Sequence, residues 1–339
     1  MSDTPAAIGA LQTRGSDQLG KRAPSVSIAI ATYNGAAHIR KQLNSFASQT
    51  RLPDEVVIFD DGSSDETVSL VTDYARKVPF AVSVERNEVN LGYNRNFEKA
   101  ISACSGDYIF ISDQDDEWFP EKISLCLDSL ISSGAHAVVN DQLIVEGDGQ
   151  ETGVSVLGNV RKLGFTDWDF GPGCCTVVTR QILPVLLPFP KDVAYDFWIN
   201  VLPAALDSRV VLDRPLQSYR RHGSNTTDAV FARAKAGAVA QSLDALRGDA
   251  RSAFKAKVAS LDLALQRLEE RSEQIASLGI DRSKWKIDYL RRERSAYASR
   301  LSCLEKGRLR RVGPIATMLL DGTYGRFRGI KTAIKDLVT

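Results

Sequence analysis

Three carboxylates lie within four residues of this chain, in the segment Asp113-Gln-Asp115-Asp116. They follow an apolar run, residues 107–112, that is typical of a β-strand. Side chains alternate along an extended chain, so we expect Asp113 and Asp115 on one side, where two close carboxylates repel unless a cation neutralises them. Hard oxygen ligands suit Mg²⁺ or Mn²⁺, which also take oxygens from a substrate diphosphate. The alternative reading is a solvated acidic turn.

Two further polar segments follow apolar runs. Asp60 and Asp61 come after residues 55–59 and are followed by Gly62-Ser63. Their carboxylates could accept hydrogen bonds from a base imide or a ribose, although Asp-Gly-Ser is also ordinary turn chemistry. Thr32-Tyr33-Asn34 comes after residues 25–31.

The elements that must position these residues alternate along the chain. Apolar, β-rich runs at residues 25–31, 55–59, 81–85, 107–112 and 136–140 are separated by helical patterns. This alternation predicts βαβ units and an α/β fold with a mostly parallel sheet covered on both faces. In such sheets ligands bind outside the carboxyl ends of the strands, which is where the three polar segments would lie.

Composition and charge narrow the function classes. With 339 residues, 43% of them hydrophobic, the chain is neither fibrous nor wholly disordered, and two domains are expected. No apolar run approaches the ~20 residues of a membrane-spanning helix. Five cysteines without a CxxC pair and three histidines exclude a disulfide framework and a Cys/His zinc site, so buried free thiols are expected.

The net charge of +1 hides an asymmetry. Residues 1–230 hold 20 basic and 30 acidic residues, whereas residues 231–339 hold 23 and 12. The acidic part would repel a diphosphate, which favours a bridging divalent cation. The GxxxxGK spacing at residues 15–21 is not expected to bind the diphosphate as a P-loop would. Arg22 stands where a P-loop needs Ser or Thr, and the segment precedes the first strand.

Four ordered motifs resemble the inverting family 2 glycosyltransferases of GT-A fold. They are VSIAIATYNG (26–35), VIFDDGS (57–63), NLGYNRN (90–96) and IFISDQDDEWFPEK (109–122). The last is most similar to bacterial polysaccharide rhamnosyltransferases. The resemblance covers about residues 24–227 and implies a GT-A nucleotide-diphospho-sugar transferase fold, with a mostly parallel central sheet and flanking helices.

The resemblance also implies roles for individual residues. Asp196, in AYDFW, matches the catalytic base, although Tyr195 stands where Glu is common. The implied metal ligands for Mg²⁺ or Mn²⁺ are Asp113, Asp115 and His222. The implied donor-binding residues are Thr32, Tyr33, Asn34, Asp60, Asp61, Arg95, Asp113, Gln114 and Gly173, the last in a glycine loop at residues 171–173.

These observations predict a disordered arm at residues 1–23, a GT-A domain at 24–227 and a helical, basic region at 228–339. Residues 282–335 hold 15 basic and 4 acidic residues among aromatic and aliphatic ones, which favours an anionic membrane surface over an oligomer contact. Nucleic acid is not expected as a partner, because no nucleic-acid motif is present. We expect a cytoplasmic protein on the inner face of the membrane, since the N-terminal residues do not form a secretory signal.

The predicted reaction is transfer of L-rhamnose from dTDP-L-rhamnose to a saccharide acceptor carried on polyprenyl diphosphate, in surface polysaccharide synthesis. Two alternatives remain open at this stage. A haloacid-dehalogenase-type phosphatase also has a strand followed by Asp-x-Asp, although it needs that motif after its first strand. A non-catalytic sugar-binding or scaffold protein is the other.

Overall fold

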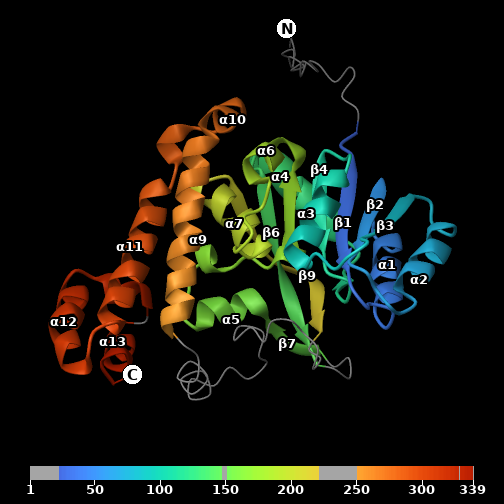
Figure 1. Cartoon of the computed structure of the whole chain (residues 1–339). Helices are drawn as coiled ribbons and strands as arrows, with labels where there is room; N and C mark the ends of the chain where they lie inside the picture. Colours follow the sequence, from blue (N-terminus) through green and yellow to red (C-terminus); the bar gives the residue numbers. More distant parts are fainter. Residues whose placement is uncertain (1–22, 147–150, 221–249, 328, 339) are drawn as a thin grey trace, which may run out of the picture.

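The computed structural model describes residues 23–146, 151–220, 250–327 and 329–338. Its centre is one nine-stranded sheet in the order β3-β2-β1-β4-β8-β6-β9-β5, with β7 beside β6 (Figure 1). The strands are β1 (Val26–Thr32), β2 (Glu55–Asp60), β3 (Ala81–Arg86), β4 (Tyr108–Ser112), β5 (Glu117–Trp118), β6 (Ala137–Val145), β7 (Glu151–Ser155), β8 (Thr176–Thr179) and β9 (Arg209–Arg220).

The parallel pairing that the sequence predicts occupies the first half of the sheet. β1 pairs in parallel with β2 and with β4, and β2 pairs in parallel with β3. The second half is mixed, since β8 runs antiparallel to β4 and β6, and β5 runs antiparallel to β9.

Helices cover both faces of the sheet because β1 alternates its side chains between two apolar cores. Ile28 and Ile30 pack with side chains of α1, α2 and α4, whereas Ala29 packs on the opposite side with those of α3, α6 and α7. The bounds are α1 (Ile39–Ala47), α2 (Thr67–Ala75), α3 (Tyr93–Ala103), α4 (Lys122–Ser133), α5 (Val156–Lys162), α6 (Leu183–Leu186) and α7 (Tyr195–Ala205).

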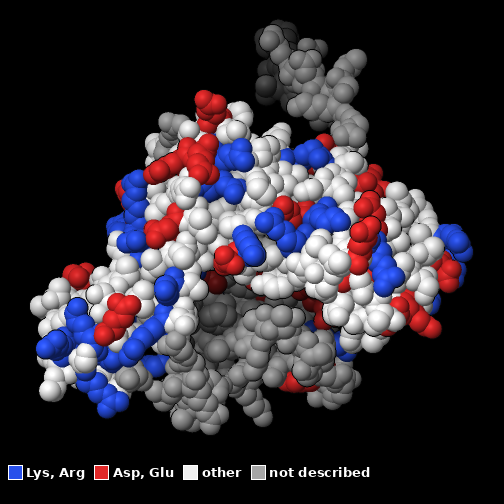
Figure 2. Space-filling view, viewed as in Figure 1, with Lys and Arg blue, Asp and Glu red and all other residues white. Residues whose placement is uncertain are grey.

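The C-terminal region is helical, as predicted. It comprises α9 (Ala250–Glu270), α10 (Ser272–Ser277), α11 (Ile287–Leu304), α12 (Val312–Leu320) and α13 (Ile330–Val338). The last two form a small core of their own with the end of α11, and Lys and Arg side chains gather on this end of the molecule (Figure 2).

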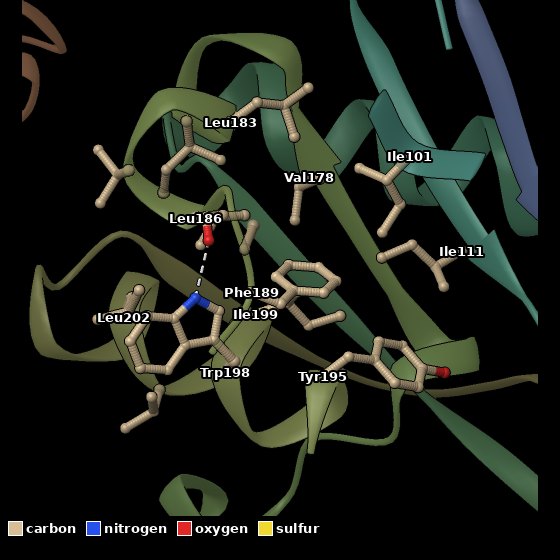
Figure 3. Packing of buried hydrophobic residues seen from close by; sticks show 14 of the residues in the cluster. Ile101, Ile111, Val178, Leu183, Leu186, Phe189, Tyr195, Trp198, Ile199 and Leu202 are labelled. Carbon is tan, nitrogen blue, oxygen red and sulfur yellow. Dashed lines mark hydrogen bonds between the residues drawn. The ribbon is translucent and has the colours of Figure 1, made fainter. Parts of the chain in front are cut away.

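The helix α9 shares the core of the sheet domain. Leu261 and Leu268 of α9 lie in the same cluster as Trp198 of α7, whose indole N–H donates to the carbonyl oxygen of Leu186 at 2.8 Å (Figure 3). Removing the C-terminal region would therefore expose apolar side chains of the sheet domain. The boundary predicted at residue 228 lies outside the described residues.

The structure also describes the cysteines and the hydrophobicity of the helices. All five cysteines are buried and unpaired, as the sequence predicts. Within the described residues, no helix is long and apolar enough to cross a bilayer. Of the arm predicted at residues 1–23, all but the last residue falls outside the described part of the chain.

Candidate active site

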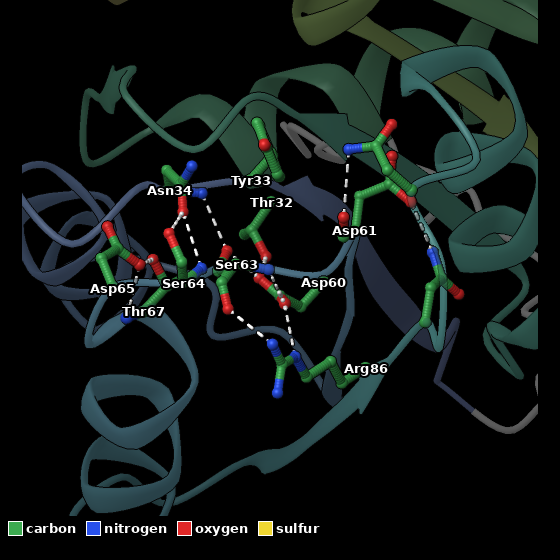
Figure 4. Close-up of polar contacts among 12 residues, drawn as sticks. Thr32, Tyr33, Asn34, Asp60, Asp61, Ser63, Ser64, Asp65, Thr67 and Arg86 are labelled. Atoms are coloured by element: carbon green, nitrogen blue, oxygen red, sulfur yellow. Dashed lines mark hydrogen bonds and ion pairs between the residues drawn. The ribbon is translucent and has the colours of Figure 1, made fainter.

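The carboxyl ends of β1, β2 and β4 meet at one edge of the sheet, because β1 lies between the other two. Thr32 at the end of β1 is in register with Asp60 at the end of β2 (Figure 4). Its hydroxyl donates to Asp60 Oδ2 at 3.0 Å, and the N–H of Ser63 donates to Asp60 Oδ1 at 2.8 Å. The fully buried Asp60 thus fixes the turn after β2 and orients the residues beside it.

Asp61 holds the next loop in place. Its Oδ1 accepts from the N–H of Leu91 at 2.8 Å and from the side-chain amide of Asn87 at 2.9 Å, and its Oδ2 accepts from the N–H of Gly92 at 2.9 Å. These bonds shape an open cavity of 410 Å³ whose lining residues are Tyr33, Asp61, Gly62, Arg86, Asn87, Glu88, Val89 and Asn90. The Tyr33 ring, half exposed, gives this cavity an aromatic surface.

The side chain of Gln114 connects the β4 loop to the β1 loop. Its Oε1 accepts from the N–H of Tyr33 at 3.0 Å, and its Nε2 donates to the carbonyl oxygen of Tyr33 at 3.2 Å. A Cβ on Gly35 would lie 2.2 Å from Gln114 Oε1, so this contact requires glycine there. Asn34 has a left-handed φ of 48° and accepts from the N–H of Ser64 at 2.9 Å, which joins the β1 and β2 loops.

The acidic segment after β4 forms a carboxylate pair of a partly exposed Asp113 and a buried Asp116. One oxygen of Asp113, one oxygen of Asp116 and Sγ of Cys174 all lie within 4.8 Å of one another. Burial, and then the charges of Asp116 and Asp115, raise the pKa of Asp113 well above its usual range. Burial and the charge of Asp115 raise the pKa of Asp116 to about 7. Two carboxylates that are this costly to ionise together fit a divalent cation between or beside them.

The pairing differs from the one that strand alternation suggested. β4 ends at Ser112 and the chain bends at residues 114–115, so Asp116, three residues after Asp113, comes back beside it. Cys174 does not fit as a ligand, because its hydrogen bond with Cys175 and its burial raise its thiol pKa well above the usual range. A protonated thiol is a poor ligand for Mg²⁺ or Mn²⁺.

Lys122 contacts the residues that surround the carboxylate pair. This lysine, 1% exposed, donates to the carbonyl oxygen of Cys174 at 2.9 Å and to Oε1 of Gln217, and its ammonium lies 3.9 Å from the Trp118 ring centroid. Nε2 of Gln217 in turn donates to Asp116 Oδ2 at 2.8 Å. Sequence reasoning quoted Lys122 only as part of a motif and missed this support.

Asp196 lies in the first turn of α7, and Asn94 of α3 holds that turn. Asn94 Oδ1 accepts from the N–H of Tyr195 at 2.9 Å, and its Nδ2 donates to the carbonyl oxygen of Val193 at 2.9 Å. Burial raises the pKa of Asp196, and the charge of Asp196 contributes to the raised pKa of Asp113. The structure therefore places the predicted base and the predicted metal ligand in one electrostatic environment.

Gly173 is required by the ring of Tyr195. A Cβ on Gly173 would lie 2.3 Å from the Tyr195 hydroxyl oxygen, so no larger residue fits without moving the ring. That ring stacks on Phe97 with centroids 4.1 Å apart. The glycine loop therefore determines how closely the start of α7 approaches the acidic pair.

Of the predicted site residues that the structure describes, Arg95 is not brought into this group. Arg95 forms an ion pair with Glu98 at 2.7 Å on the partly exposed surface of α3. His222 lies outside the described residues, so its predicted role as a metal ligand stays a prediction. The predicted roles of Asp115 as a metal ligand and of the other residues in donor binding also stay predictions.

The C-terminal region supplies a residue that sequence reasoning missed. Lys257 of α9 places its ammonium 4.0 Å from the ring centroid of Phe197, the residue after Asp196. Burial lowers the pKa of Lys257, and its positive charge partly offsets the raised pKa of Asp196. No local signal marks Lys257, because only the packing of α9 on α7 brings it near the site.

Comparisons with known proteins agree with this geometry. The sequence model of Glycosyl transferase family 2 matches residues 27–178, which include the three strand ends and the glycine loop. Residues 27–178 of the chain form a glycosyltransferase family 2 domain. This match argues against the phosphatase alternative, and so does the place of the Asp-x-Asp segment, which follows β4 and not the first strand.

The chain is also similar to individual glycosyltransferases, both in sequence and in structure. The chain is 25% identical over 213 residues to dTDP-rhamnosyl transferase RfbG of Shigella flexneri, covering 59% of this chain and 74% of RfbG. It is 31% identical over 119 residues to abequosyltransferase RfbV of Salmonella typhimurium, covering 34% of this chain but only 35% of RfbV. A structure of S. aureus TarS with UDP-GlcNAc matches with a TM-score of 0.53 and 17% identity, covering 92% and 89% of the two chains. This last likeness shows the GT-A-type fold.

Proposed function

We propose that this family 2 enzyme is a metal-dependent, inverting transferase that moves L-rhamnose from dTDP-L-rhamnose to a saccharide acceptor. The acceptor would be carried on polyprenyl diphosphate during synthesis of a bacterial surface polysaccharide. The observation that carries the proposal is the carboxylate cluster of Asp113 and Asp116 at the end of β4, whose Asp113 is also affected by the charge of Asp196 from α7.

The strand-end cavity is where the nucleoside of the donor would bind. Tyr33 offers a partly exposed ring, and Asp61 shapes the wall of the same cavity. From there the donor diphosphate would extend toward the end of β4, where Asp113 lies. Asp113 is the proposed metal ligand, because the family resemblance implies it and because it belongs to the carboxylate cluster. When bound, Mg²⁺ or Mn²⁺ would neutralise charge on the departing diphosphate.

Asp196 is suited to act as the general base. Inverting transfer is one in-line displacement at the anomeric carbon, so one carboxylate must take the proton of the acceptor hydroxyl as the new bond forms. Burial raises the pKa of Asp196, which makes it a stronger base than a solvated aspartate, and Asn94 fixes the turn that carries it. Lys257 keeps positive charge near it, which favours the ionised form that accepts a proton.

The choice of sugar rests on relatives. The similarity to RfbG, a dTDP-rhamnosyl transferase, supports dTDP-L-rhamnose as the donor. RfbV, which is also similar to this chain, is named for a different sugar, abequose. The polysaccharide context rests on the same relatives and on the motif resemblance. For a polyprenyl-linked acceptor, the enzyme would work at the cytoplasmic face of the membrane.

A panel of nucleotide sugars tests the proposal. The purified protein would be incubated with dTDP-L-rhamnose, UDP-glucose, UDP-GlcNAc and GDP-mannose, and released nucleoside diphosphate would be measured with and without EDTA. We expect EDTA-sensitive release that is fastest with dTDP-L-rhamnose. Fastest release from another donor would overturn the rhamnose assignment. Specific donor binding without any release, in the presence of a saccharide acceptor, would favour the non-catalytic sugar-binding alternative.

A further inference from the structure

The C-terminal end of the molecule exposes an unusual number of apolar side chains. We call this surface the apolar tip. It comprises Leu309, Val312, Leu319, Leu320, Ile330, Ile334, Leu337 and Val338, which are eight of the fourteen exposed large hydrophobic residues in the described part of the chain. Leu309 is 92% exposed and Leu320 is 90% exposed. These residues lie on three segments that contact one another, residues 308–311, α12 and α13. Exposed apolar side chains on adjoining segments mark an interaction site.

The helix α13 is oriented with its apolar stripe toward solvent. Ile330, Ile334 and Leu337 repeat at helical spacing and are exposed, whereas Asp336 on the opposite side is buried. This is the reverse of the usual arrangement, in which the apolar stripe of a surface helix faces the core. The outward stripe is therefore a surface that needs cover.

A buried polar network fixes that orientation. Arg300 donates to both carboxylate oxygens of Asp336 at 2.8 and 2.9 Å, and the Tyr324 hydroxyl donates to the same carboxylate at 2.9 Å. Arg311 donates to the backbone carbonyl oxygen of Asp336 at 2.8 Å. Rotating α13 to bury its apolar stripe would break the buried Arg300–Asp336 ion pair, so the stripe stays outside.

The charges around the tip select the kind of partner. Among the described residues between 305 and 338, the exposed basic ones are Lys306, Arg308, Arg310 and Lys331, and Figure 2 shows basic side chains gathered there. The exposed acidic residues of the same segment are Glu305 and Asp321. Two copies that met tip to tip would bring like charges together. We call the four exposed basic residues the basic rim. An anionic lipid surface could bury the exposed leucines among its acyl chains, and its negative charge would attract the basic rim.

We infer that the apolar tip docks this enzyme on an anionic lipid leaflet. The inference rests on the proposed function for its purpose, because a polyprenyl-linked acceptor lies in such a leaflet. In Figure 1 the chain enters β1 from above and runs downward, and α12 and α13 lie at the lower left. The carboxyl edge that holds the site and the helices of the tip thus lie toward the same, lower end of the molecule in this view.

Sedimentation with vesicles tests the docking on the full chain. Vesicles of phosphatidylglycerol and phosphatidylcholine would be compared with phosphatidylcholine alone, at low and high salt. We expect binding to the anionic vesicles that high salt weakens, since salt screens the basic rim. The double variant Leu309→Ser, Leu320→Ser should reduce the bound fraction at least tenfold. The matched control Ile131→Ser, at an exposed apolar position of α4, should bind as wild type does.

Activity on a soluble acceptor separates docking from catalysis. Release of nucleoside diphosphate should be the same for wild type and the double variant, because the tip lies outside the site. This result also shows that the variant folds. The inference is overturned if wild type ignores anionic vesicles, or if the double variant binds them as wild type does. It is also overturned if wild type is a dimer that the double variant splits.

Discussion

The carboxylate pair of Asp113 and Asp116 should make the metal-free protein less stable as the pH rises. Burial and the charge of Asp115 raise the pKa of Asp116 from an ordinary 3.8 to about 7. A group with a raised pKa in the folded state favours folding below its unfolded pKa, and this contribution is lost as the pH rises through the folded pKa. Asp116→Asn removes that titration and keeps an oxygen for the hydrogen bond from Gln217.

The size of the effect follows from the pKa of Asp116. Each pKa unit corresponds to ~1.4 kcal/mol. Between pH 5 and pH 8 the wild-type protein should therefore lose about 3 kcal/mol of unfolding free energy relative to the Asp116→Asn variant. Asp113 adds to the loss in the same direction, because the charge of Asp116 also raises the pKa of Asp113.

Urea unfolding at pH 5 and pH 8 in EDTA, repeated with Mn²⁺, measures this difference. Mn²⁺ should restore stability to wild type at pH 8 and much less to Asp116→Asn, since a bound cation stabilises only the state that binds it. The matched control is Asp128→Asn, at an exposed carboxylate of α4. The reasoning is refuted if the gap between wild type and Asp116→Asn is the same at both pH values.

Two further variants test the donor site and the base. Asp115→Asn should abolish the Mg²⁺- or Mn²⁺-dependent part of dTDP binding measured by calorimetry, and unchanged binding would remove Asp115 from the set of metal ligands. Lys257→Met should move the acidic limb of the kcat/KM profile to higher pH, because the positive charge that lowers the pKa of Asp196 is lost. The exposed Lys255→Met on the same helix is its control, and an identical shift in both variants would contradict a specific effect of Lys257.

The first half of the fold could be predicted from the sequence because its signals are local. Apolar runs bounded by turn residues marked β1 to β4, and the strand-end rule placed Thr32, Asp60 and Asp113 at one edge. The parallel order follows from the helices between these strands. The residues that hold the turns were visible for the same reason, since they directly follow the strands.

The strand β9 was missed because its sequence looks like a loop. It contains Asp213, Arg214 and Pro215, which normally interrupt a strand. In the structure Pro215 pairs with Asp141 where the register of β6 and β9 shifts, so the irregularity accommodates the proline. Such a shift depends on the partner strand and has no signature within β9.

Contacts between distant segments were also beyond the sequence. Asp116 and Gln217 meet only because β5 pairs with β9, and Lys257 approaches Asp196 only through the packing of α9 on α7. The outward apolar stripe of α13 is a similar case. Composition indicated a basic, partly apolar region, but the buried Arg300–Asp336 pair decides which side of the helix faces solvent.

The most direct test of the central claim compares turnover with donor binding in Asp196→Asn. If Asp196 takes the proton of the acceptor, turnover should fall by ~10² or more, the usual scale of general-base effects, while calorimetric affinity for the nucleotide sugar stays near wild type. The exposed Asp192→Asn, four residues earlier, should leave both unchanged. A folded Asp196→Asn protein that turns over at the wild-type rate would contradict the assignment of Asp196 as the base.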